Sequence, residues 1–163
     1  MNQESIDMSS NSCQRLLDLG YNPECAFQHR KRVSTAEKGS MYILNMGANG
    51  NNCIIFKVDG VIIKQGNKCD KLVLVELDEN AWCEMFVELK SRNDINKAIT
   101  QLECSLQNGL FVHPTNVDVR ARIVAHAFPS NRSNPEIEKA KKRFRKNYKC
   151  ELKQIKSHQP DRL

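Results

Sequence analysis

The sequence predicts an α/β protein whose mixed central sheet, an antiparallel meander followed by a βαβ crossover, is flanked by helices. Short β-rich runs separated by turn residues fill positions 53–90. A helical pattern at 94–108 then lies between two strand patterns, and a basic amphipathic pattern follows at 135–148. The chain of 163 residues has the length of one domain, which we place at 1–163.

The sequence patterns that predict secondary structure are weakest in the first third of the chain. Residues 1–12 are polar, and we expect them to be frayed. The segment 13–22, "CQRLLDLGYN", predicts a short helix that ends at Gly20. Residues 22–40 are polar and basic and fit no period, whereas "GANGNN" at 47–52 is typical of a loop.

The meander is predicted from β-rich runs at 53–58, 61–65, 69–77 and 81–90. Asp59-Gly60 lies between the first two runs, and this dipeptide indicates a two-residue hairpin turn. In the third run, apolar side chains alternate on both faces: Leu72 and Leu74 on one, Val73 and Val75 on the other. A strand of this kind is covered on both sides.

The βαβ unit consists of the strand 81–90, the helix 94–108 and the strand 117–128. Asn93 is the expected N-cap of the helix, and Gly109 fits its end. The two strands are then parallel, with a right-handed crossover between them.

The C-terminal part of the chain carries the excess of positive charge. Residues 136–156 contain nine Lys or Arg and three Glu, so this segment alone accounts for the net charge of +6. Pro135 suits the start of a basic helix over 135–148, and 150–156 predicts a short edge strand. Such a helix binds a polyanion, docks on an acidic partner protein, or is simply solvated. The candidate phosphate contacts are Lys139, Lys141, Lys142, Arg143, Arg145 and Lys146.

Cysteine spacing and hydropathy bound the class of protein. The seven cysteines form no C-x-x-C pair, so we expect reduced, buried thiols in a cytoplasmic protein and no structural zinc. No run of 18 apolar residues occurs, and the first ten residues lack an apolar segment. We therefore expect no membrane association and no secretory signal.

The stretch "MFVELKSRND" at 85–94 places Glu88 and Lys90 in a run that otherwise reads as a buried strand. A hairpin centred on residue 79 puts Asp70 opposite Glu88, with Lys90 on the same face. Two facing carboxylates repel unless a cation lies between them, and Lys90 or a divalent metal ion supplies one. The alternative is a strand end that reaches solvent.

The segments "CDKLVLVEL" and "FVELKS" resemble the D-(x)n-E-x-K signature of the PD-(D/E)xK nuclease superfamily. Asp70, Glu88 and Lys90 match its motif residues, and the order of elements in 53–128, about half of the chain, matches its core. The sequence departs from the pattern at Cys69, where the motif has Pro, and at Ser91, where many relatives have Gly.

The resemblance implies a restriction-endonuclease-like core and a role for each motif residue. Asp70 and Glu88 would hold Mg²⁺ (or Mn²⁺), and Lys90 would position the attacking water. A polar residue of the following helix often joins such a site, here Gln101 or Lys97. The alternative for Gln101 is a plain residue on the helix surface. Glu24 and Glu37 are candidates for an additional N-terminal acid.

The functional expectation is a metal-dependent nuclease that acts on DNA rather than RNA with low sequence specificity. A homodimer or a partner protein would supply targeting, and by analogy the setting is a bacterial defence or mobile-element module. Arg120 and Arg122 share a strand face and either contact phosphate or line a solvated sheet edge. The alternatives are a non-catalytic module that binds nucleic acid or assembles with a protein, and a toxin-like RNase.

Overall fold

The computed structural model describes residues 9–90, 94–128 and 134–163, which form two sheets and a layer of helices. The helices are α1 (Ser12–Asp18), α2 (Ile95–Leu106) and α3 (Pro135–Tyr148), with a 3₁₀ helix η1 at Gly109–Phe111. The strands are β1 (Cys25–Arg30), β2 (Arg32–Glu37), β3 (Ser40–Asn45), β4 (Asn51–Lys57), β5 (Lys71–Asp78), β6 (Ala81–Leu89), β7 (Asn116–Ala125), β8 (Cys150–Lys156) and β9 (Pro160–Arg162).

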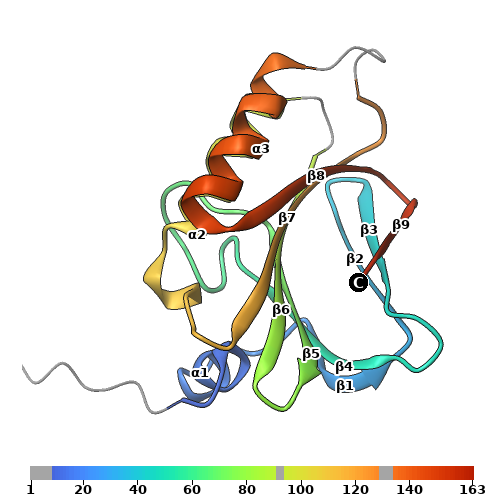
Figure 1. Ribbon diagram of the computed structural model, residues 1–163, viewed down its shortest axis with the longest axis vertical. Coiled ribbons are helices and arrows are strands. Elements are labelled where there is room, and N and C mark those ends of the chain that lie inside the picture. The colour runs from blue at the N-terminus through green and yellow to red at the C-terminus, as the bar shows by residue number, and fades with distance from the viewer. Residues whose placement is uncertain (1–8, 91–93, 129–133) are drawn as a thin grey trace, which may run out of the picture.

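The central element is a six-stranded mixed sheet in the order β1-β4-β5-β6-β7-β8. The helices pack on one face of it, and a small sheet in the order β2-β3-β9 covers the other face (Figure 1). The α/β class with a mixed sheet flanked by helices is therefore confirmed. Among the described residues, no helix combines the length and the apolar character needed to cross a membrane.

The predicted βαβ unit is confirmed. β6 and β7 pair in parallel, with Glu88 opposite Ile123, and α2 connects them. α3 makes a second crossover, because β7 and β8 also pair in parallel. α3 begins at Pro135 as expected and turns Ile137, Ala140 and Phe144 into the core.

The predicted register of the β5–β6 hairpin is also confirmed, because Lys71 pairs with Val87 and Leu72 with Phe86. Both faces of β5 are buried. Leu72 and Leu74 belong to the core under the helices, whereas Val73 and Val75 belong to the core under the small sheet. The strand is thus covered from both sides, as its composition predicts.

In the first half of the chain, the hairpin predicted at Asp59-Gly60 and its second strand at 61–65 are wrong. The run 61–65 is not a strand, because β4 pairs directly with β5 and the N–H groups of Ile62 and Ile63 both donate to Val58 O. Val58 and Ile62 are buried in this turn, so their apolar character reflects packing under the helices. Residues 22–40 hold β1 and β2, whose exposed, polar faces hide the strand period.

Two helix ends also differ from expectation. Asp94 caps α2 through a hydrogen bond from Lys97 N–H, and Asn93, the expected cap, lies outside the described residues. α2 ends before Gly109, which opens η1 instead. Of the segment expected to be frayed, 1–8 lies outside the described residues, but Asn11 caps α1 and Ser12 is buried.

The seven cysteines all lie in described residues and are free thiols. Cys25 and Cys104 are half-buried, and the other five are buried as expected.

Candidate active site

The structure brings the three motif residues together at one end of the six-stranded sheet. Asp70 directly precedes β5, Glu88 is near the end of β6, and the hairpin register places them opposite each other. Lys90 follows β6, and its backbone N–H donates to Val124 O of β7. All three side chains are buried, at 1%, 0% and 8% relative exposure.

Asp70 is held by two donors. Its Oδ2 accepts a hydrogen bond from the backbone N–H of Leu89 at 2.8 Å, and its Oδ1 accepts one from Lys38 Nζ at 2.8 Å. Burial works to raise the pKa of Asp70, but the neighbouring Glu88 carboxyl and Lys38 ammonium outweigh it and lower this pKa. Asp70 is therefore the ionised member of the carboxyl pair.

Glu88 is in the opposite situation. Among the described residues neither of its carboxyl oxygens has a hydrogen-bond partner. Of the cations in the described ranges, Lys38 Nζ and Lys90 Nζ lie nearest, at 3.6 Å and 4.0 Å from Oε1. Burial, and then the adjacent Asp70 carboxylate, raise the pKa of Glu88 to about 9. At neutral pH, and without a further cation, the pair therefore keeps one proton.

Gln101 reaches the site from α2. Lys90 Nζ donates a hydrogen bond to Gln101 Oε1 at 2.6 Å, so the amide fixes the direction of the lysine side chain. Burial lowers the pKa of Lys90, although the nearby Glu88 carboxyl acts to raise it. The structure thus brings the four expected residues Asp70, Glu88, Lys90 and Gln101 into one group.

Lys38 is the site residue that the sequence did not predict. It lies in the two-residue turn Lys38-Gly39 between β2 and β3, where both residues have positive φ, 53° and 79°. Its ammonium lies between Asp70 and Glu88. The available signal was the Lys-Gly dipeptide between two short alternating segments, which marks a tight hairpin but does not say what its tip contacts.

Glu24 and Glu37 do not enter this group. Both contact Lys71, whose ammonium hydrogen-bonds to Glu24 Oε1 and lies 3.6 Å from Glu37 Oε2. Lys71 is buried and points to the face of β5 opposite to Asp70. The two acids thus neutralise a buried lysine, and the expected third acid of the site is not supplied by either.

The donor set suits a divalent metal ion. Two buried carboxylates are hard oxygen ligands, and the oxygens of Glu88, which accept no hydrogen bond from the described residues, could bind a cation. In the part of the chain that the structure describes, no cluster of three or more His, Cys, Asp or Glu side chains has the geometry of a metal site. Asp70 and Glu88 would therefore be the only two acidic side chains among these residues to hold the ion, and water and phosphate oxygens would complete its shell.

The basic face of α3 is exposed as expected. Lys142, Arg145 and Lys146 are exposed on the side of the helix away from the core. The other cations have acidic neighbours: Lys139 lies near Glu136, Lys141 near Glu138, and Arg143 near Glu103.

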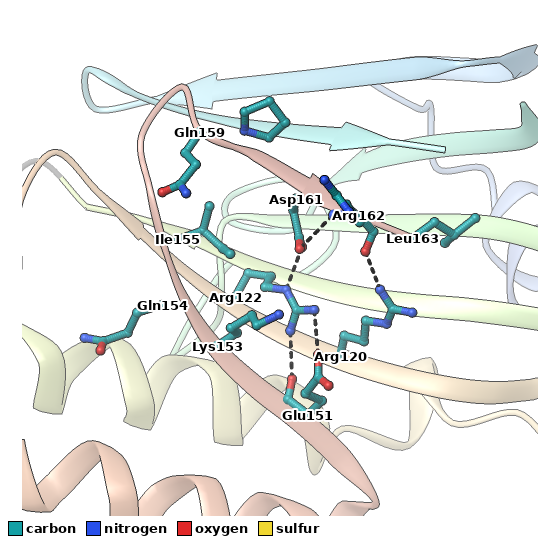
Figure 2. A pocket seen from close by; sticks show the side chains of 11 residues that line it. Arg120, Arg122, Glu151, Lys153, Gln154, Ile155, Gln159, Asp161, Arg162 and Leu163 are labelled. Carbon is teal, nitrogen blue, oxygen red and sulfur yellow. Dashed lines mark hydrogen bonds and ion pairs between the residues drawn. The ribbon is translucent and has the colours of Figure 1, made fainter. Parts of the chain in front are cut away.

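Arg120 and Arg122 lie elsewhere, along a cavity of about 500 Å³ between β8 and β9 (Figure 2). Arg122 is 1% exposed and bonds to Asp161 at 2.7 Å and to Glu151 at 2.8 Å. Arg120 pairs with Asp118 at 2.8 Å and donates to Arg162 O. Because these guanidinium groups already bond to protein oxygens, we leave them out of the proposed nucleic-acid interface.

Comparison with protein-family models, with curated proteins and with solved structures gave no match. The resemblance to PD-(D/E)xK nucleases therefore stays a prediction from the motif residues of the sequence.

Proposed function

We propose that this protein is a metal-dependent nuclease that hydrolyses phosphodiester bonds, with DNA as the favoured substrate, on a restriction-endonuclease-like core of the PD-(D/E)xK type. One observation carries the proposal. A buried carboxyl pair, Asp70 and Glu88, lies beside a lysine that Gln101 holds in place. A structural ion pair has no need of a second carboxyl whose oxygens accept no hydrogen bond from any described residue.

Each residue has a distinct role in this proposal. Asp70 and Glu88 would hold Mg²⁺ or Mn²⁺, which when bound lowers the pKa of a coordinated water and offsets charge on the phosphate. Lys90 orients the attacking water and stabilises negative charge that develops on the phosphoryl oxygens. Gln101 is a positioning residue, because it acts through its hydrogen bond to Lys90.

The exposed cations of α3 supply affinity for the substrate backbone. Contacts of this kind are made to phosphates and carry no base information, so we propose low intrinsic sequence specificity. A partner protein or a second copy of the chain would then direct the enzyme to its target.

One observation favours the alternative of a non-catalytic module. Lys38 already neutralises Asp70 at 2.8 Å, as it would in a purely structural ion pair. In that case the same fold binds nucleic acid or a partner protein without cleaving a bond.

A cleavage assay separates the two functions. Wild-type protein and Lys90→Ala are incubated with supercoiled, linear, single-stranded and branched DNA and with RNA, in Mg²⁺, in Mn²⁺ and in chelator. We expect metal-dependent cleavage of at least one DNA form by the wild type and a loss of 100-fold or more in Lys90→Ala. Binding of DNA without cleavage of any substrate in either metal would favour the non-catalytic module.

A further inference from the structure

The ammonium of Lys38 occupies the position between the two carboxyl groups of the candidate site. Its Nζ lies 2.8 Å from Asp70 Oδ1 and 3.6 Å from Glu88 Oε1. The side chain is still 37% exposed, so it has a path to solvent. A cation at this point competes directly with any metal ion that uses the same two oxygens.

The backbone of Lys38 adopts a costly conformation. Its φ is 53°, in the left-handed region, where a two-residue hairpin turn of this type favours Asn, Asp or Gly at the first position. A lysine there costs free energy without improving the turn. Backbone strain of this kind often lies at functional sites, and here it accompanies the contact of the ammonium with Asp70.

The tip of the β2–β3 hairpin is fixed to the ends of the central strands. Ser40 Oγ donates to Lys90 O at 2.6 Å, and His126 Nε2 lies 2.5 Å from Gly39 O. Met41 N–H donates to Ser157 Oγ at 2.9 Å. These contacts hold the backbone of the turn in place, so only the side chain of Lys38 is free to change position.

Lys38 and Lys90 already offset the full negative charge that the two carboxyl groups can carry. Asp70 and Glu88 bring two negative charges when both are ionised, and Lys38 and Lys90 bring two positive charges. A divalent ion added to this group leaves it with an excess of two positive charges in a buried setting, which is unfavourable. Each phosphodiester group of a nucleic acid brings one negative charge and reduces that excess.

We infer that Lys38 is a built-in competitor that makes metal binding depend on substrate. The carboxyl pair accepts Mg²⁺ or Mn²⁺ strongly only when a phosphodiester binds with it, and Lys38 then leaves Asp70 to contact the phosphate. This inference rests on the proposed function, since it concerns the same metal and the same substrate class.

The test is a titration of Mg²⁺ by calorimetry, with and without a short phosphorothioate DNA duplex. The proteins are the wild type, Lys38→Met, Lys38→Arg and Lys31→Met. Lys31 is an exposed lysine that follows β1 at the far end of the strands from Asp70, so Lys31→Met is the control for loss of one positive charge. Circular dichroism shows whether each variant is folded.

In the wild type we expect the duplex to raise Mg²⁺ affinity at least tenfold. Lys38→Met should bind Mg²⁺ alone at least tenfold more tightly than the wild type, and Lys38→Arg and Lys31→Met should behave like the wild type. Equal Mg²⁺ affinity in the wild type and Lys38→Met, with no effect of the duplex, would overturn the inference but keep the metal site. Absence of Mg²⁺ binding in every protein, with and without duplex, would overturn the metal site and the inference together.

Discussion

The carboxylate of Asp70 accepts a hydrogen bond from the backbone N–H of Leu89 at 2.8 Å, so that the residue before β5 is tied to the end of β6. The same carboxylate binds Lys38 through its other oxygen. Asp70 thus has a structural role in addition to its proposed role as a metal ligand, and the two roles can be separated by substitution.

We predict that Asp70→Ala lowers the free energy of unfolding by about 2–3 kcal/mol, because it leaves the buried N–H of Leu89 unpaired. Asp70→Asn keeps an amide oxygen for that N–H and should stay within about 1 kcal/mol of the wild type. Urea denaturation measures both values. Equal losses in the two variants would show that the bond to Leu89 does not stabilise the fold.

The pH dependence of stability should depend on Asp161. Burial acts to raise the pKa of Asp161, but hydrogen bonds from Tyr42 and Arg122, at 2.6 and 2.7 Å, outweigh it and lower this pKa. An acid whose pKa is lower in the folded state stabilises the fold above its unfolded pKa of 3.8. That contribution is lost as the pH falls below this value.

We predict that Asp161→Asn costs about 2–4 kcal/mol at pH 7, because it breaks a buried ion pair with Arg122, and that its stability falls less steeply below pH 4. Urea denaturation at pH 7, 5 and 3 tests this. Asp118→Asn is the control, since the pair with Arg120 is more exposed and should contribute under about 1 kcal/mol. Parallel pH profiles of the wild type and Asp161→Asn would contradict the prediction.

The fold was predictable where local pattern and packing agree. The turn at 78–80 separates two apolar runs, and this was enough to place Asp70 opposite Glu88. The run at 61–65 is not a strand, because Ile62 is buried in a turn and its N–H bonds to Val58 and not to a neighbouring strand. The run is as rich in β-forming residues as the runs that do form strands, so composition does not separate them.

Long-range partners were the part of the site that the sequence could not supply. Lys38 meets Asp70 across 32 residues, and Arg122 meets Asp161 across 39. The sequence around Arg122 does not show whether its guanidinium is buried in an ion pair or exposed to a phosphate. Gln101 was a candidate because the resemblance implies a polar residue on the helix after the motif, and its bond to Lys90 brings it into the group.

The basic face of α3 should act as a general contact for the nucleic-acid backbone. We predict that Lys142→Gln combined with Arg145→Gln weakens DNA binding several-fold at low salt. The slope of log affinity against log salt should become shallower by about 2, because two phosphate contacts are lost. Fluorescence anisotropy of a labelled duplex at several salt concentrations measures this slope.

The matched control is Lys31→Gln combined with Arg32→Gln, which removes two exposed charges beside β1, at the sheet edge opposite to β8 and α3. This pair of changes should leave the slope unaltered. If both double variants reduce the slope equally, the attraction comes from net charge and α3 is not the contact surface.

The carboxyl of Glu88 is the group on which the proposed cleavage depends most, and strand β6 offers a matched control for it. Burial raises the pKa of Glu84 well above its usual value, as it does for Glu88, and both side chains are at most 3% exposed. A glutamine imitates the protonated acid at each position, so both variants should fold. Glu84 contacts Asn116 and lies outside the candidate site.

The most direct measurement is the single-turnover rate of DNA cleavage in Mg²⁺ by the wild type, Glu88→Gln and Glu84→Gln, with folding checked by circular dichroism. We predict that Glu88→Gln lowers the rate at least 100-fold, because it removes a metal ligand, and that Glu84→Gln stays within threefold of the wild type. Equal rates in all three proteins would contradict the assignment of the active site to Asp70, Glu88 and Lys90.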